Sequence, residues 1–367
     1  MSKNFDVCIR GDGIVGRTLA LLLARERLRV ALVSGPAHQP PSEDVRAYAI
    51  NAPSRALLTQ LRAWPEGTAV TPVSQMNVWG DSGGRLDFTP PAGHEDGLAW
   101  IVDVPALEQS LAQALRFAPE VERVSSPDDA KAALTVVCEG RQSSSRSEFG
   151  AGWTVKPYDQ KAVAARLQAE RPHGGVARQW FGQGEVLALL PLGGAEGSSL
   201  ALVWSVPVAR AEALQKMSPD ELTAALYQVC GDEVGPLTLI SPVASWPLNL
   251  SSAGRWVGPG WALAGDAAHT VHPMAGQGLN LGLADARTLA EVLQGREYWR
   301  ALGDEKLLRR YERARKADVL AMTTVTEGLH GLFAHSDSRW QALRNWGMQG
   351  VARSGPLKAW LTRQATG

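Results

Sequence analysis

The twelve residues Phe5–Gly16, FDVCIRGDGIVG, decide the fold of this chain. Their first half is a short apolar run that predicts a buried strand, and their second half has the spacing Gly11-x-Gly13-x-x-Gly16. In a dinucleotide-binding turn the first glycine permits the tight turn and the second lets the backbone approach a pyrophosphate, while the third allows close helix–strand packing. The pattern therefore predicts a nucleotide-binding turn, with a glycine-rich turn of some other α/β protein as the alternative.

The residues after this turn complete a βαβ unit. Arg17–Glu26 is rich in Leu and Ala and predicts a helix, whose N-terminus would offer N–H donors and a positive dipole end to phosphates. Arg29–Val33 predicts the second strand. An acidic residue that binds ribose hydroxyls is expected where this strand ends, but Ser34 stands there. The ribose contact therefore lacks its usual bidentate acceptor.

A second glycine-rich stretch, Trp261–Asn280, reads WALAGDAAHTVHPMAGQGLN. Its first residues predict a strand that ends in Gly-Asp, and Asp266 at a strand end can bind a sugar or polyol hydroxyl. Backbone N–H groups at Gly276–Gly278, which open a long helix, can stabilise negative charge on a ring system. His269-x-x-His272 is not expected to bind a metal, because no carboxylate or cysteine cluster accompanies it.

The middle of the chain predicts a sheet inserted into this α/β framework. Successive strand candidates follow one another with Gly or Pro between several of them, as in an antiparallel sheet: Ala162–Glu170, Val176–Phe181, Val186–Leu190 and Leu200–Ser205. Ser218-Pro219-Asp220-Glu221 then predicts a helix start with a capping serine. Everything after about Gly276 is expected to be helical.

Composition narrows the class of protein. The 367 residues suggest two or three domains, and 45% hydrophobic residues exclude a disordered chain. The 37 basic residues balance 37 acidic ones, which argues against a nucleic-acid binder. Three scattered cysteines favour a reducing compartment. Without a signal peptide or a long apolar run, we expect a cytoplasmic protein.

Together these motifs resemble the flavoprotein aromatic hydroxylases of the p-hydroxybenzoate hydroxylase fold, and most closely the ubiquinone-biosynthesis hydroxylases. The resemblance rests on Gly265-Asp266 through Gly282-x-x-Asp285-Ala286, on Arg46-Ala47-x-Ala49 and on Tyr311-Glu312-Arg313-x-Arg315. It implies an α/β fold: a Rossmann-like FAD-binding domain with an inserted antiparallel β-sheet substrate domain and C-terminal helices. The implied ranges are 1–66, 98–150 and 250–300 for the FAD-binding domain, 67–97 and 151–249 for the substrate domain, and 301–367 for the C-terminal helical region.

The same resemblance implies an FAD-dependent monooxygenase that hydroxylates an aromatic ring with NADPH or NADH and O₂, the leading substrate being a polyprenyl phenol of ubiquinone biosynthesis. The implied cofactor-binding residues are Gly11, Gly13, Gly16, Ser34, Arg46, Glu108, Gly265, Asp266, Gly276, Gly278 and Asn280. The implied flavin-facing residues are Pro273, Gly276, Gln277 and Gly278. The choice between NADH and NADPH stays open, and no side chain stands out as a catalytic base.

Three departures from the family pattern concern the cofactor. Ser34 replaces the usual Glu, Glu108 stands where these proteins often have a Gln, and Glu139 replaces the Asp of a third motif. They leave two alternatives to the leading hypothesis: a hydroxylase of a small soluble aromatic, and an FAD-poor homologue that acts as a lipid-binding or assembly partner. The intact stretch Gly265–Asp285 favours the enzyme. Flavin halogenases share the fold, but the chain lacks a GWxWxIP motif.

The C-terminal part differs in charge from the rest. Arg296–Gly367 holds 13 Lys and Arg against 7 Asp and Glu, so it carries +6 and the remainder −6. Its apolar stripes include Trp340, Trp346 and Trp360, and they favour docking on the FAD domain. The alternative is peripheral contact with anionic lipid at the inner membrane face, which would deliver a prenylated substrate.

Overall fold

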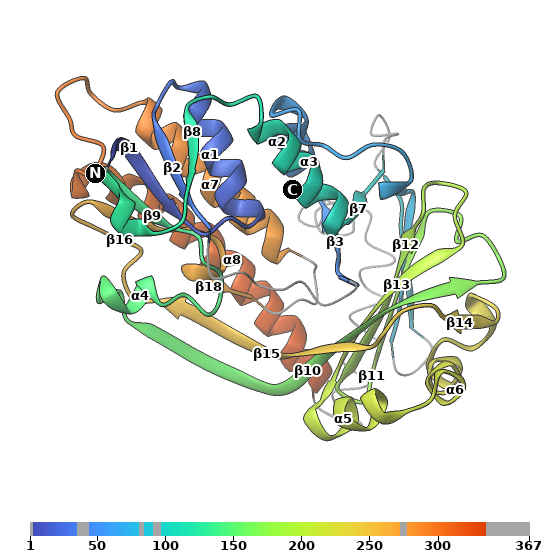
Figure 1. Ribbon diagram of the computed structural model, residues 1–367. Coiled ribbons are helices and arrows are strands. Elements are labelled where there is room, and N and C mark those ends of the chain that lie inside the picture. The colour runs from blue at the N-terminus through green and yellow to red at the C-terminus, as the bar shows by residue number, and fades with distance from the viewer. Residues whose placement is uncertain (1–2, 35–43, 81–83, 91–96, 272–276, 335–367) are drawn as a thin grey trace.

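The N-terminal βαβ unit forms the centre of a six-stranded sheet (Figure 1). The computed structural model describes residues 3–34, 44–80, 84–90, 97–271 and 277–334. The strand order is β16 (Val257–Gly258), β17 (Trp261–Leu263), β9 (Ala130–Val137), β1 (Lys3–Arg10), β2 (Val30–Val33) and β8 (Val121–Val124). Every pair is parallel except β16–β17, so this sheet has the parallel arrangement of a nucleotide-binding fold.

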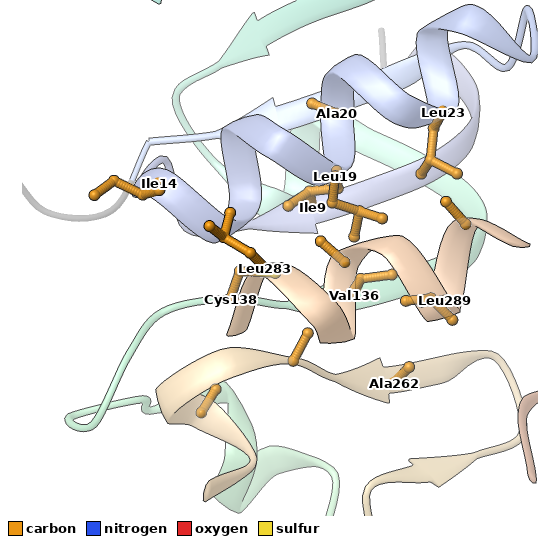
Figure 2. Packing of buried hydrophobic residues seen from close by; sticks show 14 of the residues in the cluster. Ile9, Ile14, Leu19, Ala20, Leu23, Val136, Cys138, Ala262, Leu283 and Leu289 are labelled. Carbon is orange, nitrogen blue, oxygen red and sulfur yellow. The ribbon is translucent and has the colours of Figure 1, made fainter. Parts of the chain in front are cut away.

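Helices bury the main core against this sheet. The helices are α1 (Ile14–Arg25), α3 (Val104–Leu115) and α7 (Gly278–Gln294), and α1 contacts both of the others. Figure 2 shows Leu19 and Leu23 of α1 facing Leu283 and Leu289 of α7 with Ile9 of β1 nearby, all fully buried. Each such side chain contributes roughly 1.5–3 kcal/mol through burial. The Leu- and Ala-rich composition of α1 therefore supplies both its helix propensity and its packing face.

The second sheet fills the other half of the molecule. Its order is β18 (His269–Thr270), β15 (Ala244–Ala253), β10 (Trp153–Ala169), β13 (Ser199–Pro207), β12 (Glu185–Leu192), β11 (Val176–Gly182), β5 (Gln75–Trp79) and β6 (Arg85–Phe88), with β14 (Leu237–Leu239) beside β10. It is antiparallel, as expected, except that β5 runs parallel to β11. Strand β5 precedes the antiparallel strands in the chain and pairs with β11, the last of them in this order.

A small third sheet lies between the two large ones. It consists of β3 (Ala47–Ile50), β7 (Ala99–Asp103) and β4 (Val70–Val73) in that order. Ile101 of β7 packs with Leu192 and Ala201 of the second sheet, which joins the two halves through apolar contact. The remaining elements are α2 (Ala52–Gln60), α4 (Ser145–Glu148), α5 (Val208–Lys216), α6 (Pro219–Cys230), α8 (Glu305–Ala334) and the 3₁₀ turns η1 (Gly67–Ala69), η2 (Pro127–Asp129), η3 (Gly231–Glu233) and η4 (Gly265–Ala267).

The α/β fold class is confirmed, although several elements, α5 and β15 among them, were not predicted from the sequence. Helix α5 was not predicted, because it buries only Ala211 and Leu214 and so lacks a clear apolar period. Strand β15 was not predicted either, since Pro247 interrupts its pattern at the point where β10 shifts register. The predicted boundary between residues 249 and 250 falls inside β15, and the domain ranges stay a prediction.

Helices α5 and α6 cover one face of the second sheet. The capping box predicted for α6 is present: Ser218 Oγ accepts from the Glu221 N–H, and Glu221 Oε2 accepts from the Ser218 N–H at 2.8 Å. Trp204 and Trp180 lie on this covered face with 0% and 8% exposure. Both tryptophans are therefore core residues rather than walls of a ligand pocket.

The long helix α8 connects the two large sheets. Near its start, the Tyr311 hydroxyl donates to the carbonyl oxygen of Leu263 in β17 at 2.8 Å. Sixteen residues later, Glu327 accepts from the Tyr158 hydroxyl at 2.7 Å and pairs with Lys156, both in β10. Among the described residues no helix combines the length and apolarity needed to cross a membrane.

The carboxylate of Asp285, in α7, joins three other elements. It is fully buried and accepts from the Gly265 N–H in η4 at 2.8 Å. Nε2 of His269 in β18 lies 2.7 Å from the same oxygen, and Arg315 Nε of α8 donates to the other oxygen at 2.7 Å. Burial acts to raise the pKa of Asp285, but His269 and Arg315 outweigh it and hold the pKa below its ordinary value.

We expect Asp285→Asn to lower the free energy of unfolding by about 3–5 kcal/mol, because it leaves the buried Arg315 guanidinium without its buried counter-charge. Urea or thermal unfolding measures this loss. The matched control is Asp318→Asn, since Asp318 pairs with the same arginine but is 65% exposed; its removal should cost about 1 kcal/mol or less. Equal losses in the two variants would contradict the central role of Asp285.

Candidate functional site

Two glycines of the first motif are required by close backbone contacts. Gly11 has a φ of +115°, and a Cβ there would lie 2.4 Å from the carbonyl oxygen of Cys138. A Cβ on Gly16 would lie 2.0 Å from the carbonyl oxygen of Gly11. The turn and the start of α1 can therefore approach β9 only with glycine at both positions, as their spacing predicts.

Gly13 has neither of these reasons to be glycine. Its backbone is extended, with φ −87° and ψ −175°, and a Cβ there would meet no atom within 4 Å. It is the N-cap of α1, which has no side-chain capping bond and no acidic residue in its first turn. No atom of the described residues therefore fills the space beside Gly13 at this helix start, as close approach of a pyrophosphate requires.

The second motif packs directly on the first. A Cβ added at Gly282 of α7 would lie 2.8 Å from Cγ2 of Val15, and a Cβ added at Gly265 would lie 3.2 Å from the same carbon. Gly265 itself has a φ of +63°, which lets η4 turn away from β17. Sequence reasoning missed Val15; the two glycines that face it were the available signal. The interlock brings the N-termini of α1 and α7 to the same edge of the sheet.

Asp266 follows this turn at the carboxyl end of β17. Its side chain is exposed, yet desolvation by the surrounding protein raises the pKa of Asp266, with His269 and Arg141 opposing the shift and Asp285 adding to it. Burial is the main cause of the raised pKa of Tyr48 in β3, and the nearby charge of Asp266 also raises it. A carboxylate placed in this way can accept hydrogen bonds from a polyol chain such as the ribityl group.

Arg46 is held by acidic residues. Its guanidinium donates to both oxygens of Asp44, with Nη2 2.6 Å from Oδ2, and the bond to Asp44 is the main cause of the raised pKa of Arg46. Glu108 lies 3.9 Å from the same guanidinium. Glu108 thus has a cation nearby, although Arg46 already pairs with Asp44. The contact of Arg46 with FAD stays a prediction.

Asn280, in the first turn of α7, uses its amide within the protein. Its Oδ1 accepts from the Asn51 N–H at 3.1 Å, and its Nδ2 donates to the Ala49 carbonyl at 2.8 Å and to Gln277 Oε1. The side chain is 4% exposed and ties α7 to β3. These bonds fix the start of α7 against β3, and a contact of Asn280 with FAD stays a prediction.

Gly278 begins α7, and a Cβ there would meet no atom of the described residues within 4 Å. Pro273 and Gly276 lie outside the described residues. Glu139 folds back on its own loop, where it accepts from the hydroxyls of Ser143 and Ser145. Its extra methylene relative to Asp is therefore accommodated locally.

Gly13 and Gly16 provide a matched pair of substitutions. Gly13→Ala should fold with an unchanged melting temperature but bind FAD at least tenfold more weakly, because its methyl group would occupy the open space at the α1 N-terminus. Gly16→Ala should lower the melting temperature as well, since its Cβ would overlap the Gly11 carbonyl. Titration of apoprotein with FAD and thermal unfolding separate the two effects. Unchanged FAD affinity in Gly13→Ala would show that the pyrophosphate lies elsewhere.

Comparison with known proteins agrees with this geometry. The family model of the FAD binding domain matches residues 111–326. The chain is 31% identical to ubiquinone hydroxylase UbiL of Rhodospirillum rubrum, covering 100% of this chain and 90% of that protein. It is 30% identical to 3-demethoxyubiquinol 3-hydroxylase of Escherichia coli, covering 99% and 98%.

Solved structures share the fold. PqsL of Pseudomonas aeruginosa, a probable FAD-dependent monooxygenase, superposes with a TM-score of 0.76 at 21% identity, over 94% of this chain and all of that one. The p-nitrophenol 4-monooxygenase PnpA of Pseudomonas putida gives 0.76 at 19% identity, over 100% and 99%. With the space beside Gly13 and Gly278 unfilled by the described residues and an acceptor at Asp266, the residues fit FAD. The chain belongs to the FAD-dependent monooxygenase family that includes the ubiquinone hydroxylases.

Proposed function

We propose that this protein hydroxylates the aromatic ring of a polyprenylated phenol in ubiquinone biosynthesis. The observation that carries the proposal is the identity of 31% and 30%, over essentially the whole chain, to two proteins named for hydroxylation of ubiquinone or its precursor. Such similarity extends through both large sheets, so it includes the elements that would contact the substrate as well as those that would hold FAD.

The second sheet offers an apolar surface for such a substrate. Ala164, Val203 and Ala188 are direct partners across β10, β13 and β12, so their side chains share one face of the sheet. This is the face opposite to the one that α5 and α6 cover. Two residues along the strands, Leu190 and Ala201 of the same face belong to the cluster that includes Ile101 of β7. This face is therefore apolar where it approaches the third sheet.

The site residues have distinct roles in the proposed reaction. FAD, when bound, supplies the redox chemistry by accepting reducing equivalents from NADPH or NADH and using O₂ to hydroxylate the ring. The N–H groups at the start of α7, beginning with Gly278, can stabilise negative charge on a ring held in front of them. Asp266 would orient the cofactor's polyol chain, and the apolar sheet face would exclude water from the reacting atoms.

A product assay with a short-chain prenyl phenol tests this function. FAD-loaded protein should consume NADPH or NADH and O₂ and yield the phenol with one added oxygen, detected by mass spectrometry. Val203→Asp should lower hydroxylation at least tenfold with unchanged FAD content, because the half-buried Val203 lies on the apolar face. The control Val155→Asp alters a 47% exposed valine of the same sheet and should leave the rate unchanged. Absence of hydroxylated product from prenylated phenols would refute the proposal.

We further propose that the basic C-terminal residues bring the protein to an anionic membrane surface, where a prenylated substrate resides. Residues 335–367 lie outside the described part of the chain, and the support is their sequence: Arg339, Arg344, Arg353, Lys358 and Arg363 stand among Trp340, Trp346 and Trp360.

Flotation with anionic vesicles should recover the parent protein at low salt and lose it when four of these basic residues, Arg339, Arg344, Arg353 and Lys358, become Ala. Neutral vesicles are the control. Binding that is equal for neutral and anionic vesicles would contradict an electrostatic contact, and no binding to either would favour docking of this segment on the protein's own FAD domain.

A further inference from the structure

The end of β2 lacks the acid that normally binds a ribose. The strand ends at Val33, and Ser34 follows with an exposed side chain. A serine hydroxyl carries no charge and has a single oxygen, so it lacks the pair of oxygens with which a carboxylate accepts from both hydroxyls of a ribose. The glycine turn nevertheless lies against this strand end, because the Gly11 N–H donates to the Val33 carbonyl at 3.1 Å.

The glycine turn after β1 places a carboxylate at the end of β2. Asp12, the variable residue between the first two glycines of the motif, lies with Oδ2 3.3 Å from the hydroxyl of Ser34, which donates to it. Its side chain is 16% exposed, so the group is partly enclosed yet accessible. An acidic acceptor therefore stands at the end of β2 although it belongs to the turn after β1.

Arg17, in the first turns of α1, fixes the orientation of Asp12. Arg17 Nε donates to Asp12 Oδ1 at 2.6 Å, and Nη1 donates to the carbonyl oxygen of Glu108 in α3 at 2.9 Å. One carboxylate oxygen is thereby held by the arginine, and the other is directed toward Ser34. The guanidinium also offsets a negative charge that would otherwise repel a pyrophosphate in front of Gly13. A carboxylate in this turn is tolerable because this cation accompanies it.

We propose that Asp12, oriented by Arg17 and assisted by Ser34, binds the hydroxyl groups of the adenosine ribose of FAD in place of the missing acid of β2. This inference rests on FAD binding and is independent of the aromatic substrate. If Asp12 only supported the turn, its bond to Arg17 would suffice. The second oxygen at the end of β2 is what a ribose contact requires.

The test compares FAD with two analogues that lack the 2′- or the 3′-hydroxyl of the adenosine ribose. Apoprotein is titrated with each ligand, and flavin fluorescence gives the dissociation constants. The parent protein should bind at least one analogue about tenfold more weakly than FAD, the loss expected for a hydrogen bond to a charged acceptor. In Asp12→Gly this difference should fall to about twofold or less, with FAD itself bound about tenfold more weakly.

A second variant distinguishes a ribose contact from a structural role. Asp12→Gly combined with Ser34→Glu restores an acid at the end of β2, so it should recover both FAD affinity and the discrimination against the analogues. If thermal unfolding shows that Asp12→Gly is destabilised, Asp12→Asn takes its place, because asparagine keeps the side-chain shape. Asp12→Asn should then show the same loss of FAD affinity and of discrimination. If Asp12 had only a structural role, Asp12→Gly would weaken the binding of all three ligands equally, and Ser34→Glu would not restore it.

Two results would overturn the proposal. One is a parent protein that binds both analogues as tightly as FAD, and the other is an Asp12→Gly variant that still discriminates against them. These binding measurements do not involve hydroxylation. A protein that discriminates between the ligands as expected but hydroxylates no phenol would refute the proposed function and leave the role of Asp12 intact.

Discussion

The fully buried carboxylate of Asp285 is the constraint on which the arrangement of the site depends. An ionised group without water must have all its partners, and here the partners come from η4, β18 and α8. The bond to the Gly265 N–H fixes the turn that presents Asp266. Asp285 belongs to α7, so the same carboxylate also fixes the helix whose N-terminus opens toward the ring. One buried charge thereby sets the relative position of two groups that are predicted to contact the same cofactor.

Apolar packing also holds the two glycine turns and α7 in their relative positions. Val15 fills the space left by Gly265 and Gly282, so the first turn, the second turn and α7 can approach only in one arrangement. Asn280 adds polar bonds to Ala49 and Asn51, which tie the start of α7 to β3, the strand just after Arg46. Among the described residues, close packing of the two turns and α7 thus surrounds the glycines that are predicted to face the cofactor.

Features that depend on local sequence could be predicted, and features that depend on distant partners could not. The βαβ unit, the glycine motif and the capping box at Ser218 each follow from residues a few positions apart, and the structure contains all three. The parallel pairing of β5 with β11 joins segments about a hundred residues apart, and no turn fixes its direction. The pairing of Asp12 with Ser34 depends on where the glycine turn meets the end of β2, which spacing does not specify. Asn280 fits the family motif, but its buried partners Asn51 and Ala49 are more than 200 residues away and could not be inferred from it.

Helix α8 limits how this chain can change length during evolution. Tyr311 and Glu327 are fastened to different sheets, and sixteen helical residues between them span about 24 Å. Inserting or deleting a single residue within this interval would turn Glu327 by about 100° around the helix axis and separate it from Tyr158 and Lys156. Substitutions on the solvent side of the helix leave this distance and angle unchanged. We therefore expect homologous chains to vary on the solvent side of this segment while its residue count stays fixed.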